Sequence, residues 1–153
     1  MRFLLFALSI LFFSACSENF VYSEKQVISN TEWTYADTLA FAIPIADTTK
    51  KYNLYLDIQH TTDYPYQNIY MNVTTEYPSG KRVTELLPID FADKTGQWYG
   101  DCNAESCQLR VNIQQRAFFN EIGTHRIVFE QYLREDPLRG MQSMALRMEE
   151  IKE

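Results

Sequence analysis

Residues 52–77, YNLYLDIQHTTDYPYQNIYMNVTTEY, contain the two clearest strand patterns of the chain, separated by an aromatic turn. Apolar side chains recur at every second position in each half, at Tyr52, Leu54, Leu56 and Ile58 and then at Ile69, Met71 and Val73. This period of two residues is typical of a half-buried β-strand, whereas an amphipathic helix has a period near 3.6. Two half-buried antiparallel strands need a second layer over their apolar faces, so the sequence predicts a β-sandwich.

The remainder of the chain favours the same fold class. Further alternating stretches occur in residues 39–45, 83–91, 109–113, 126–133 and 144–149, with a weaker one in residues 26–33. Pro44 indicates an edge strand, and the imperfect alternation around Glu85 and Pro88 predicts an interruption or bulge. We expect an all-β fold, a single-domain antiparallel and jelly-roll-like β-sandwich of about eight strands.

The first fifteen residues have the features of a secretory signal peptide. Arg2 precedes an apolar run at residues 3–13, and small residues follow before Cys16. The string FSAC at residues 13–16 resembles a lipobox, with Phe13 in place of the usual leucine. We therefore expect cleavage before Cys16, lipidation of that cysteine and attachment to a membrane through the lipid anchor. The alternative is an ordinary signal peptide in which Cys16 has no special role.

These features divide the chain into a signal peptide (residues 1–15), a lipidated N-terminus with a tether (residues 16–25) and one sandwich domain (residues 26–153). Ser17, and not aspartate, follows the expected lipidated cysteine. By the sorting rule known from other Gram-negative bacteria, this favours the outer membrane of the cell envelope. The sequence does not determine which leaflet carries the protein.

The net charge argues against two classes of partner. The chain has a formal charge of -6 at pH 7, which becomes about −7 once Arg2 is removed with the signal peptide. Nucleic acid and anionic lipid headgroups both require a basic face. We therefore expect no nucleic-acid partner.

Two cysteines, Cys102 and Cys107, remain in the mature chain, in the string GDCNAESCQ. In an exported chain, one close pair of cysteines favours a local disulfide. A zinc site would need further soft ligands, and no histidine is nearby. Because the loop closed by the bond is short, its entropic contribution is only about 2 kcal/mol, so the bond shapes a loop more than it stabilises the domain.

Motifs of high specificity for catalysis are absent from the sequence. It contains no Gly-x-Ser-x-Gly, His-Glu-x-x-His, Cys-x-x-Cys or glycine-rich phosphate loop. Neither of the two histidines, His60 and His125, lies beside a glycine-bracketed nucleophile. We expect no catalytic residue, metal or cofactor. An envelope hydrolase would require carboxylates such as Asp57, Asp63 and Asp90 to converge in a deep cleft.

Aromatic residues concentrate in two loops, DYPYQN at residues 63–68 and GQWYG at residues 96–100. We expect these loops to meet at one end of the sandwich and to form an interaction surface, because partly exposed aromatic side chains concentrate binding energy. Some of these side chains should fill the core and others should contact a partner. The candidate residues are Tyr64, Tyr66, Trp98 and Tyr99.

A carbohydrate-binding module on the same lipid anchor is the alternative function. It would bind a glycan on a planar row of aromatic rings, for which Tyr55, Tyr64, Tyr66 and Tyr70 are the candidates. Separately, Asp-Thr-Leu at residues 37–39 and Asp-Thr-Thr at residues 47–49 resemble the O-glycosylation signal of Bacteroidetes. Thr38 and Thr48 are thus predicted modification sites, the alternative being ordinary turn or strand threonines.

Several blocks taken together carry a family resemblance over most of the mature chain. They are the lipobox cysteine, Trp33, DYPYQNIY at residues 63–70, GQWYG at residues 96–100 and YLREDPLRGM at residues 132–141. In this order and spacing they resemble the gliding-motility lipoproteins of Bacteroidetes, specifically the GldH family. Two features depart from the family pattern, namely the Cys102 and Cys107 pair and the YLR string at residues 132–134, where a methionine is expected before the arginine.

The resemblance implies a non-enzymatic envelope protein that is needed for the assembly or stability of the gliding apparatus. It also implies a link to type IX secretion of adhesins, and partners among the other gliding and secretion proteins of the envelope. It implies neither a catalytic residue nor a cofactor.

Overall fold

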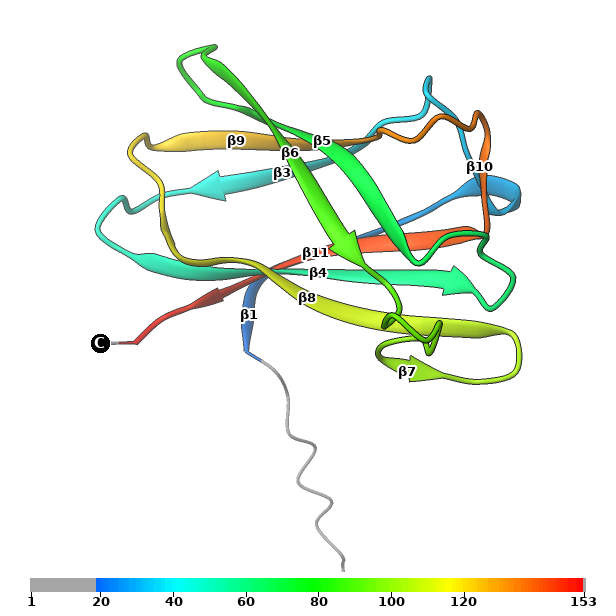
Figure 1. The fold of residues 1–153 in the computed structure, drawn as a ribbon. Coiled ribbons are helices and arrows are strands. Elements are labelled where there is room, and N and C mark those ends of the chain that lie inside the picture. The colour runs from blue at the N-terminus through cyan, green and yellow to red at the C-terminus, as the bar shows by residue number, and fades with distance from the viewer. Residues whose placement is uncertain (1–18, 153) are drawn as a thin grey trace, which may run out of the picture.

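The computed structural model describes residues 19–152, which form two antiparallel sheets packed face to face (Figure 1). One sheet has the strand order β1-β11-β4-β8-β7 and the other has the order β3-β9-β5-β6. The long strands are β1 (Phe20–Val27), β3 (Leu39–Ile45), β4 (Lys51–Thr61), β5 (Asn68–Glu76), β6 (Arg82–Asp90), β8 (Ser106–Phe118), β9 (Gly123–Gln131) and β11 (Met141–Glu150).

Three strands have only two residues each. They are β2 (Glu32–Trp33), β7 (Asp101–Cys102) and β10 (Leu138–Arg139), and a short 3-10 turn, η1 (Ser29–Thr31), precedes β2. The strands β2 and β10 pair with each other in a small ribbon beside the main sheets. The predicted all-β sandwich is confirmed. About eight strands were expected, and the structure has eight long strands and these three short ones.

The alternating pattern of residues 52–77 places its side chains as predicted, but the two strands do not pair. The inward residues of β4, from Tyr52 to Ile58 at every second position, are at most 6% exposed. β4 pairs with β11 and β8, whereas β5 pairs with β6 and β9. The aromatic turn therefore carries the chain from one sheet to the other, and the two apolar faces cover each other across the core.

The domain begins earlier than predicted. Residues 20–25, expected in the tether, belong to β1, which pairs with β11 from Phe20 opposite Glu149 to Val27 opposite Ser143. The sequence signal is weak because β1 is an edge strand and alternates only loosely, with few side chains packed on the core. At the end of this strand Val27 is 75% exposed, whereas Ile28, which follows it, is buried.

Two further predictions concern prolines and strand edges. Pro44 lies in β3, which is an edge strand as predicted. The predicted interruption in β6 is wrong, because β6 pairs with β5 without a register shift from Asp90 to Arg82. Since β6 is also an edge strand, Pro88 and Glu85 are accommodated without a bulge.

The two ends of the sandwich differ in what they carry. The first residue of β1, Phe20, pairs with Glu149 near the end of β11, so the chain enters the domain beside its C-terminal strand end. The opposite end carries η1 and β2 together with the loops that follow β4, β6 and β9 (Figure 1). The predicted aromatic loops are thus at the end far from the termini.

Candidate interaction surface

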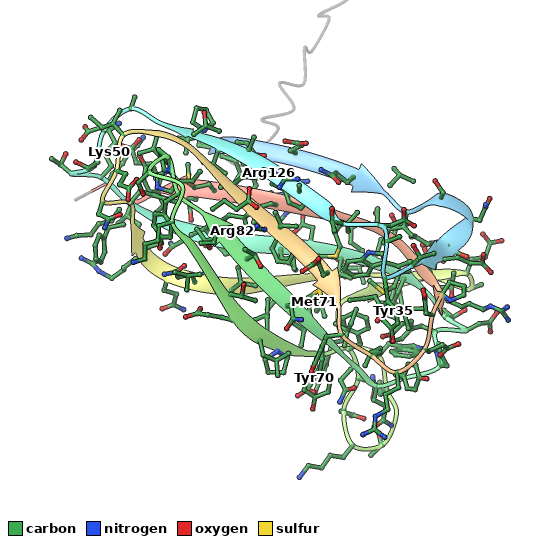
Figure 2. All side chains as sticks on the ribbon, turned by 90° about the horizontal axis from the view of Figure 1, so that it is seen from above. Tyr35, Lys50, Tyr70, Met71, Arg82 and Arg126 are labelled. Atoms are coloured by element: carbon green, nitrogen blue, oxygen red, sulfur yellow. A yellow bond between two sulfur atoms is a disulfide. The ribbon has the colours of Figure 1, made fainter. Side chains whose placement is uncertain are left out.

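Five tyrosines project into solvent at the end of the sandwich far from the termini. Their side chains belong to residues that are 38% to 60% exposed, and they are every exposed tyrosine within residues 19–152. We call this group the tyrosine end; its members are Tyr35, Tyr66, Tyr70, Tyr99 and Tyr132. Figure 2 shows Tyr35 and Tyr70 together at this end, with Lys50 at the opposite end.

Hydrogen bonds connect the loops of the tyrosine end to one another. The Tyr66 hydroxyl donates to Glu135 Oε2 at 2.8 Å, and the Tyr35 hydroxyl donates to the Leu133 carbonyl at 2.5 Å. The Tyr132 amide donates to the Tyr70 carbonyl at 2.8 Å. The loop between β9 and β10 is therefore fixed to both neighbouring loops, which positions the exposed rings on one surface.

The two predicted aromatic loops meet, as expected. The amide of Phe91, which directly follows β6 in the segment leading to the second loop, donates to the carbonyl of Gln67 in the first loop at 2.7 Å. Tyr64 is 3% exposed and Trp98 is half-buried, so these two fill the interior, whereas Tyr66 and Tyr99 are 39% and 44% exposed. The four candidates thus divide into two core side chains and two outward ones, and partner binding by the outward pair stays a prediction.

An aromatic cluster around His60 packs in the interior, next to the loops of the tyrosine end. The His60 ring stacks on Phe91 with centroids 4.8 Å apart and 3° between the ring planes, and Trp98 and Tyr64 pack against it at 4.8 and 5.6 Å. His60 is fully buried, its Nδ1 lies 2.8 Å from the Thr61 carbonyl, and its Nε2 has no hydrogen-bond partner among the described residues. The cluster is thus part of the packed interior and is not a site open to a ligand.

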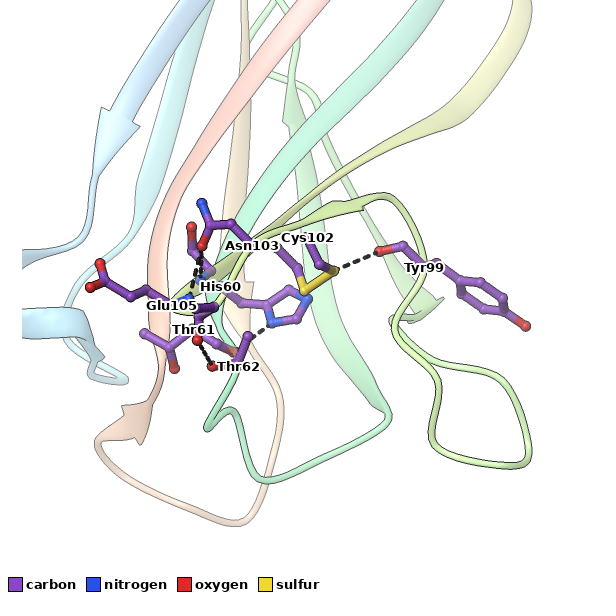
Figure 3. The surroundings of a disulfide bond; sticks show 10 residues. His60, Thr61, Thr62, Tyr99, Cys102, Asn103 and Glu105 are labelled. Carbon is purple, nitrogen blue, oxygen red and sulfur yellow. Dashed lines mark hydrogen bonds between the residues drawn. A yellow bond between two sulfur atoms is a disulfide. The ribbon is translucent and has the colours of Figure 1, made fainter.

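Cys102 and Cys107 form a disulfide that joins β7 to β8 beside this cluster (Figure 3). Cys107 lies opposite His60 in the sheet. The loop between the cysteines is fixed by Asn103 Oδ1, which accepts the amides of Glu105 and Ser106 at 2.8 Å. Figure 3 shows the Tyr99 ring pointing away from the disulfide, so this loop helps to hold Tyr99 in an outward position.

The structure does not assemble the aromatic row expected of a carbohydrate-binding module. Tyr64 is buried, and Tyr55 packs against Phe20 with centroids 6.0 Å apart on the outer face of the five-stranded sheet. Of the four candidates for the glycan-binding row, only Tyr66 and Tyr70 are exposed at the tyrosine end. The four candidate rings are thus on different surfaces, which argues against a planar glycan platform built from them.

The candidate carboxylates do not form a catalytic pair either. Asp57 is 5% exposed and is bound by two arginines, while Asp63 and Asp90 are exposed to solvent. Within residues 19–152, there is no group of three histidine, cysteine or acidic residues that could hold a metal ion. The same part of the chain contains no helix long and apolar enough to cross a membrane.

Two of the three predicted modification sites, Thr38 and Thr48, lie within the described residues. Thr38 is exposed just before β3, and Thr48 is partly buried in the turn between β3 and β4. Glycosylation of either threonine stays a prediction. Cys16, the predicted lipidation site, lies outside the described residues.

Comparison with known proteins gives the family. The family model described as GldH lipoprotein matches residues 20–148, which is nearly the whole sandwich. The chain belongs to the GldH lipoprotein family. One relative is a gliding motility lipoprotein GldH homolog of Christiangramia forsetii, 26% identical over 152 residues that cover 95% of this chain and 93% of the relative. Another is the gliding motility lipoprotein GldH of Flavobacterium johnsoniae, 26% identical over 149 residues that cover 93% and 91% of the two chains.

Of the blocks that carry the GldH resemblance, those within residues 19–152 converge at the tyrosine end. Trp33 on β2 pairs with Leu138, which belongs to the block at residues 132–141. The Thr61 amide, just before the block at residues 63–70, donates to the Gly140 carbonyl at 2.8 Å. The block at residues 96–100 contains Trp98 and Tyr99, already placed at this end. Segments far apart in the sequence of this GldH-family chain therefore build one structural region.

Sequence reasoning missed Tyr35 and Tyr132 as members of the tyrosine end, and it named Tyr70 only as a candidate of the glycan-binding row. Each lies in a separate segment, and only the strand order brings them together. The block at residues 132–141 was a usable signal for Tyr132, because it begins with this tyrosine and belongs to the blocks that carry the family resemblance.

We expect acid to destabilise this GldH-family domain below about pH 6.5. His60 and His125 are fully buried, and burial lowers the pKa of each below its ordinary value. Between that lowered pKa and the unfolded value, the unfolded chain binds more protons than the folded chain, so the free energy of unfolding falls as the pH falls. Urea unfolding at a series of pH values measures this slope.

The matched variant for this measurement is His125→Phe. Neither nitrogen of His125 has a hydrogen-bond partner among the described residues, and the ring packs between Tyr77 and Phe119. Phenylalanine should therefore fill the site and reduce the dependence of stability on pH. An unchanged slope in this variant would contradict the assignment to His125.

Proposed function

We propose that this chain is a non-enzymatic lipoprotein of the cell envelope that supports the gliding-motility apparatus. Its role is that of an assembly or stability factor linked to type IX secretion, and its partners are other envelope proteins of that apparatus. The observation that carries this proposal is membership of the GldH lipoprotein family over residues 20–148, together with two full-length relatives named for gliding motility. The proposal assigns no catalytic residue and no cofactor.

The geometry supports a role in which one end is anchored and the other end binds. If Cys16 carries lipid, residues 17–19 alone separate it from β1, and this reach is at most about 14 Å. The tyrosine end lies about eight strand residues away from the start of β1, or about 26 Å. The domain would thus sit close to the membrane and direct the tyrosine end away from it, toward partner proteins.

Outer-membrane sorting is part of the same proposal. It rests on Ser17 after the predicted lipidated cysteine and on the lipoprotein character of the family. The leaflet is left open.

The variant Cys16→Ser tests the anchor and the function together. Without the acceptor thiol, no lipid can be attached, and we expect the protein to leave the membrane fraction and to lose most of its ability to restore gliding to a strain that lacks the gene. Membrane fractionation, colony spreading and adhesin secretion are the measurements. A variant that stays in the outer membrane, or that restores gliding from the soluble fraction, would contradict the proposal. Ser17→Ala is the control, because it changes the adjacent residue and keeps the acceptor.

A further inference from the structure

The two lateral sides of the sandwich are built differently. On one side, the edge strands β1 and β3 are bridged by the Gln26 side-chain amide, which donates to the Ala40 carbonyl. On the other side, the edges are β6 and, beyond the two-residue β7, the long strand β8. In Figure 1, β5 and β6 run obliquely over β4 and β8. The first side is closed, and the second side is open.

A cleft occupies the open side. One cavity of about 280 Å³ is lined by apolar and polar residues of both sheets. A second cavity of about 340 Å³ shares with it Leu54, Thr75, Tyr77, Gln114 and Ile127. We call the two together the inter-sheet cleft. Its apolar lining includes Leu54, Val73, Val83, Leu87, Ile113 and Ile127. In the middle of β8, the inward residues Leu109, Val111 and Ile113 are only half-buried, whereas Leu54 and Leu56 of the adjacent β4 are at most 2% exposed. The apolar side chains of the core are therefore partly exposed to solvent along this side.

The inter-sheet cleft is framed at both of its ends. At the end near the termini, Ser79 in the β5–β6 turn donates its amide and hydroxyl to the Glu121 carboxylate, each at 2.9 Å. At the other end, the Tyr99 amide donates to the Phe91 carbonyl at 2.7 Å and holds the loop that leads to β7. The opening between these frames is as long as β6, which has nine residues and spans about 30 Å.

The edge of β6 that borders the cleft presents backbone groups to solvent. Two backbone hydrogen bonds, from the Phe91 amide to the Gln67 carbonyl and from the Tyr77 amide to the Lys81 carbonyl, lie at the two ends of the β5–β6 pairing and continue its register. Both involve odd-numbered residues, and hydrogen-bonded positions alternate along an antiparallel pair, so the odd-numbered residues of β6 bond to β5. Arg82, Thr84 and Leu86 therefore direct their amides and carbonyls outward, and Pro88, in the same phase, removes one donor near the end of the strand. Within residues 19–152, β6 has no strand neighbour other than β5.

We propose that the inter-sheet cleft accepts an extended segment of another protein, which adds to the sheet as a strand alongside β6. An open edge beside an apolar groove is the arrangement used in strand addition, where main-chain hydrogen bonds supply affinity and alternate side chains supply specificity. β6 is the acceptor rather than β8, because β8 has register shifts opposite Leu54 that twist its edge.

The lining of the cleft defines the chemistry of the added segment. Val83, Glu85 and Leu87 share the inward phase of β6, and Glu85 is the one carboxylate among the described residues that line the cleft. Glu85 is solvent-exposed but shares the phase of Val83 and Leu87 on this edge strand, so pairing with a second copy of the same edge would bring two Glu85 carboxylates together, and their repulsion opposes it. The segment should therefore present apolar residues at alternate positions with one lysine or arginine opposite Glu85. This site is separate from the tyrosine end and does not depend on it.

The test uses the mature chain carrying Cys16→Ser and the capped peptide Val-Thr-Val-Thr-Lys-Thr-Val-Thr-Val, whose odd positions would face the cleft. Amide hydrogen exchange measured by NMR should show that the peptide slows exchange at Thr84 and Leu86 by at least about tenfold. The same peptide with its β6-facing amides methylated should give no such protection, because it keeps the side chains and loses the main-chain donors.

Two protein variants complete the test. Leu86→Pro removes an outward amide without removing a bond to β5, and should abolish protection at Thr84; Leu86→Thr keeps the amide and should retain it. Equal protection by the methylated peptide, equal binding to Leu86→Pro and Leu86→Thr, or no slowing at saturating peptide would each overturn the proposal. If Leu86→Pro fails to fold, the comparison of the two peptides on the unchanged strand still decides the question.

Discussion

Trp33→Ala is expected to lower the free energy of unfolding by about 3–5 kcal/mol, the range for removing a fully buried large aromatic side chain. Trp33 is 0% exposed and belongs to the core, although it lies on a strand of only two residues. Its Nε1 also donates to the Asp37 carbonyl at 2.7 Å. The variant leaves a cavity and an unpaired carbonyl where β2 and β10 cover the end of the sandwich.

Urea unfolding of the mature chain measures this change, with Phe118→Ala as the matched control. Phe118 is an aromatic residue that is 72% exposed, so its loss should change the free energy of unfolding by no more than about 0.5 kcal/mol. A Trp33→Ala variant as stable as Phe118→Ala would show that the β2–β10 ribbon is not part of the cooperative core.

Asp57→Asn should produce the second large loss of stability. The Asp57 carboxylate accepts bonds from Arg110 Nε and Nη2 at 2.6 and 2.9 Å and from Arg147 Nε at 2.5 Å. The Phe20 ring covers both guanidinium groups at 5.2 and 5.3 Å from its centroid. Burial alone would raise the pKa of Asp57, but the two arginines outweigh burial and hold the pKa below its ordinary value. The carboxylate is thus charged in the folded chain.

Removing the charge of one partner in a buried ion pair typically costs about 3–5 kcal/mol. The side chains of Arg110 and Arg147 remain 35% and 27% exposed, so water compensates part of the loss. We therefore expect Asp57→Asn to cost about 2–3 kcal/mol at neutral pH. Asp90→Asn, at an exposed aspartate on the other sheet, is the control and should be near neutral. Equal stability of the two variants would contradict a stabilising role for the Asp57 cluster.

The Asp57 cluster also shows where sequence reasoning reaches its limit. The alternation in β4 correctly assigns Leu56 and Ile58 to the core and Asp57 to the other face. Burial of Asp57 on that face depends on Arg110 and Arg147, which are 53 and 90 residues away in the chain. A periodic pattern reports which face a residue is on, but it does not report which distant side chains cover it.

The same limit explains the error at β1 and why the strand order did not follow from the sequence. An edge strand such as β1 needs few apolar residues, so its sequence resembles a polar tether. The choice between pairing within one sheet and facing across the core depends on long-range contacts, and both arrangements bury the same alternate residues. By contrast, the bounds of β3 and the edge position of Pro44 follow from local sequence and were predictable, whereas β4 and β11 extend beyond their predicted alternating stretches.

For the candidate site, the sequence predicted which loops meet but only part of the surface that they form. The aromatic strings at residues 63–68 and 96–100 pointed to the correct end of the sandwich, and the exposed Tyr66 and Tyr99 were among the candidates. Tyr64 shows why exposure could not be assigned, because its burial depends on Phe91 and His60 from other strands. The contribution of Tyr132 required knowledge of the hydrogen bond to Tyr70.

The central claim is that the tyrosine end binds other envelope proteins of the gliding apparatus, and the double variant Tyr66→Ala with Tyr99→Ala tests it most directly. The measurement is recovery of cross-linked gliding and secretion proteins from cells, scored beside the thermal stability of each purified variant, with Phe118→Ala as an exposed aromatic control at the other end. We predict that the double variant melts within a few degrees of the unchanged chain and recovers at least about tenfold less partner, while Phe118→Ala recovers a normal amount. Normal recovery by a folded double variant, or loss of partners only in variants that unfold, would contradict the claim.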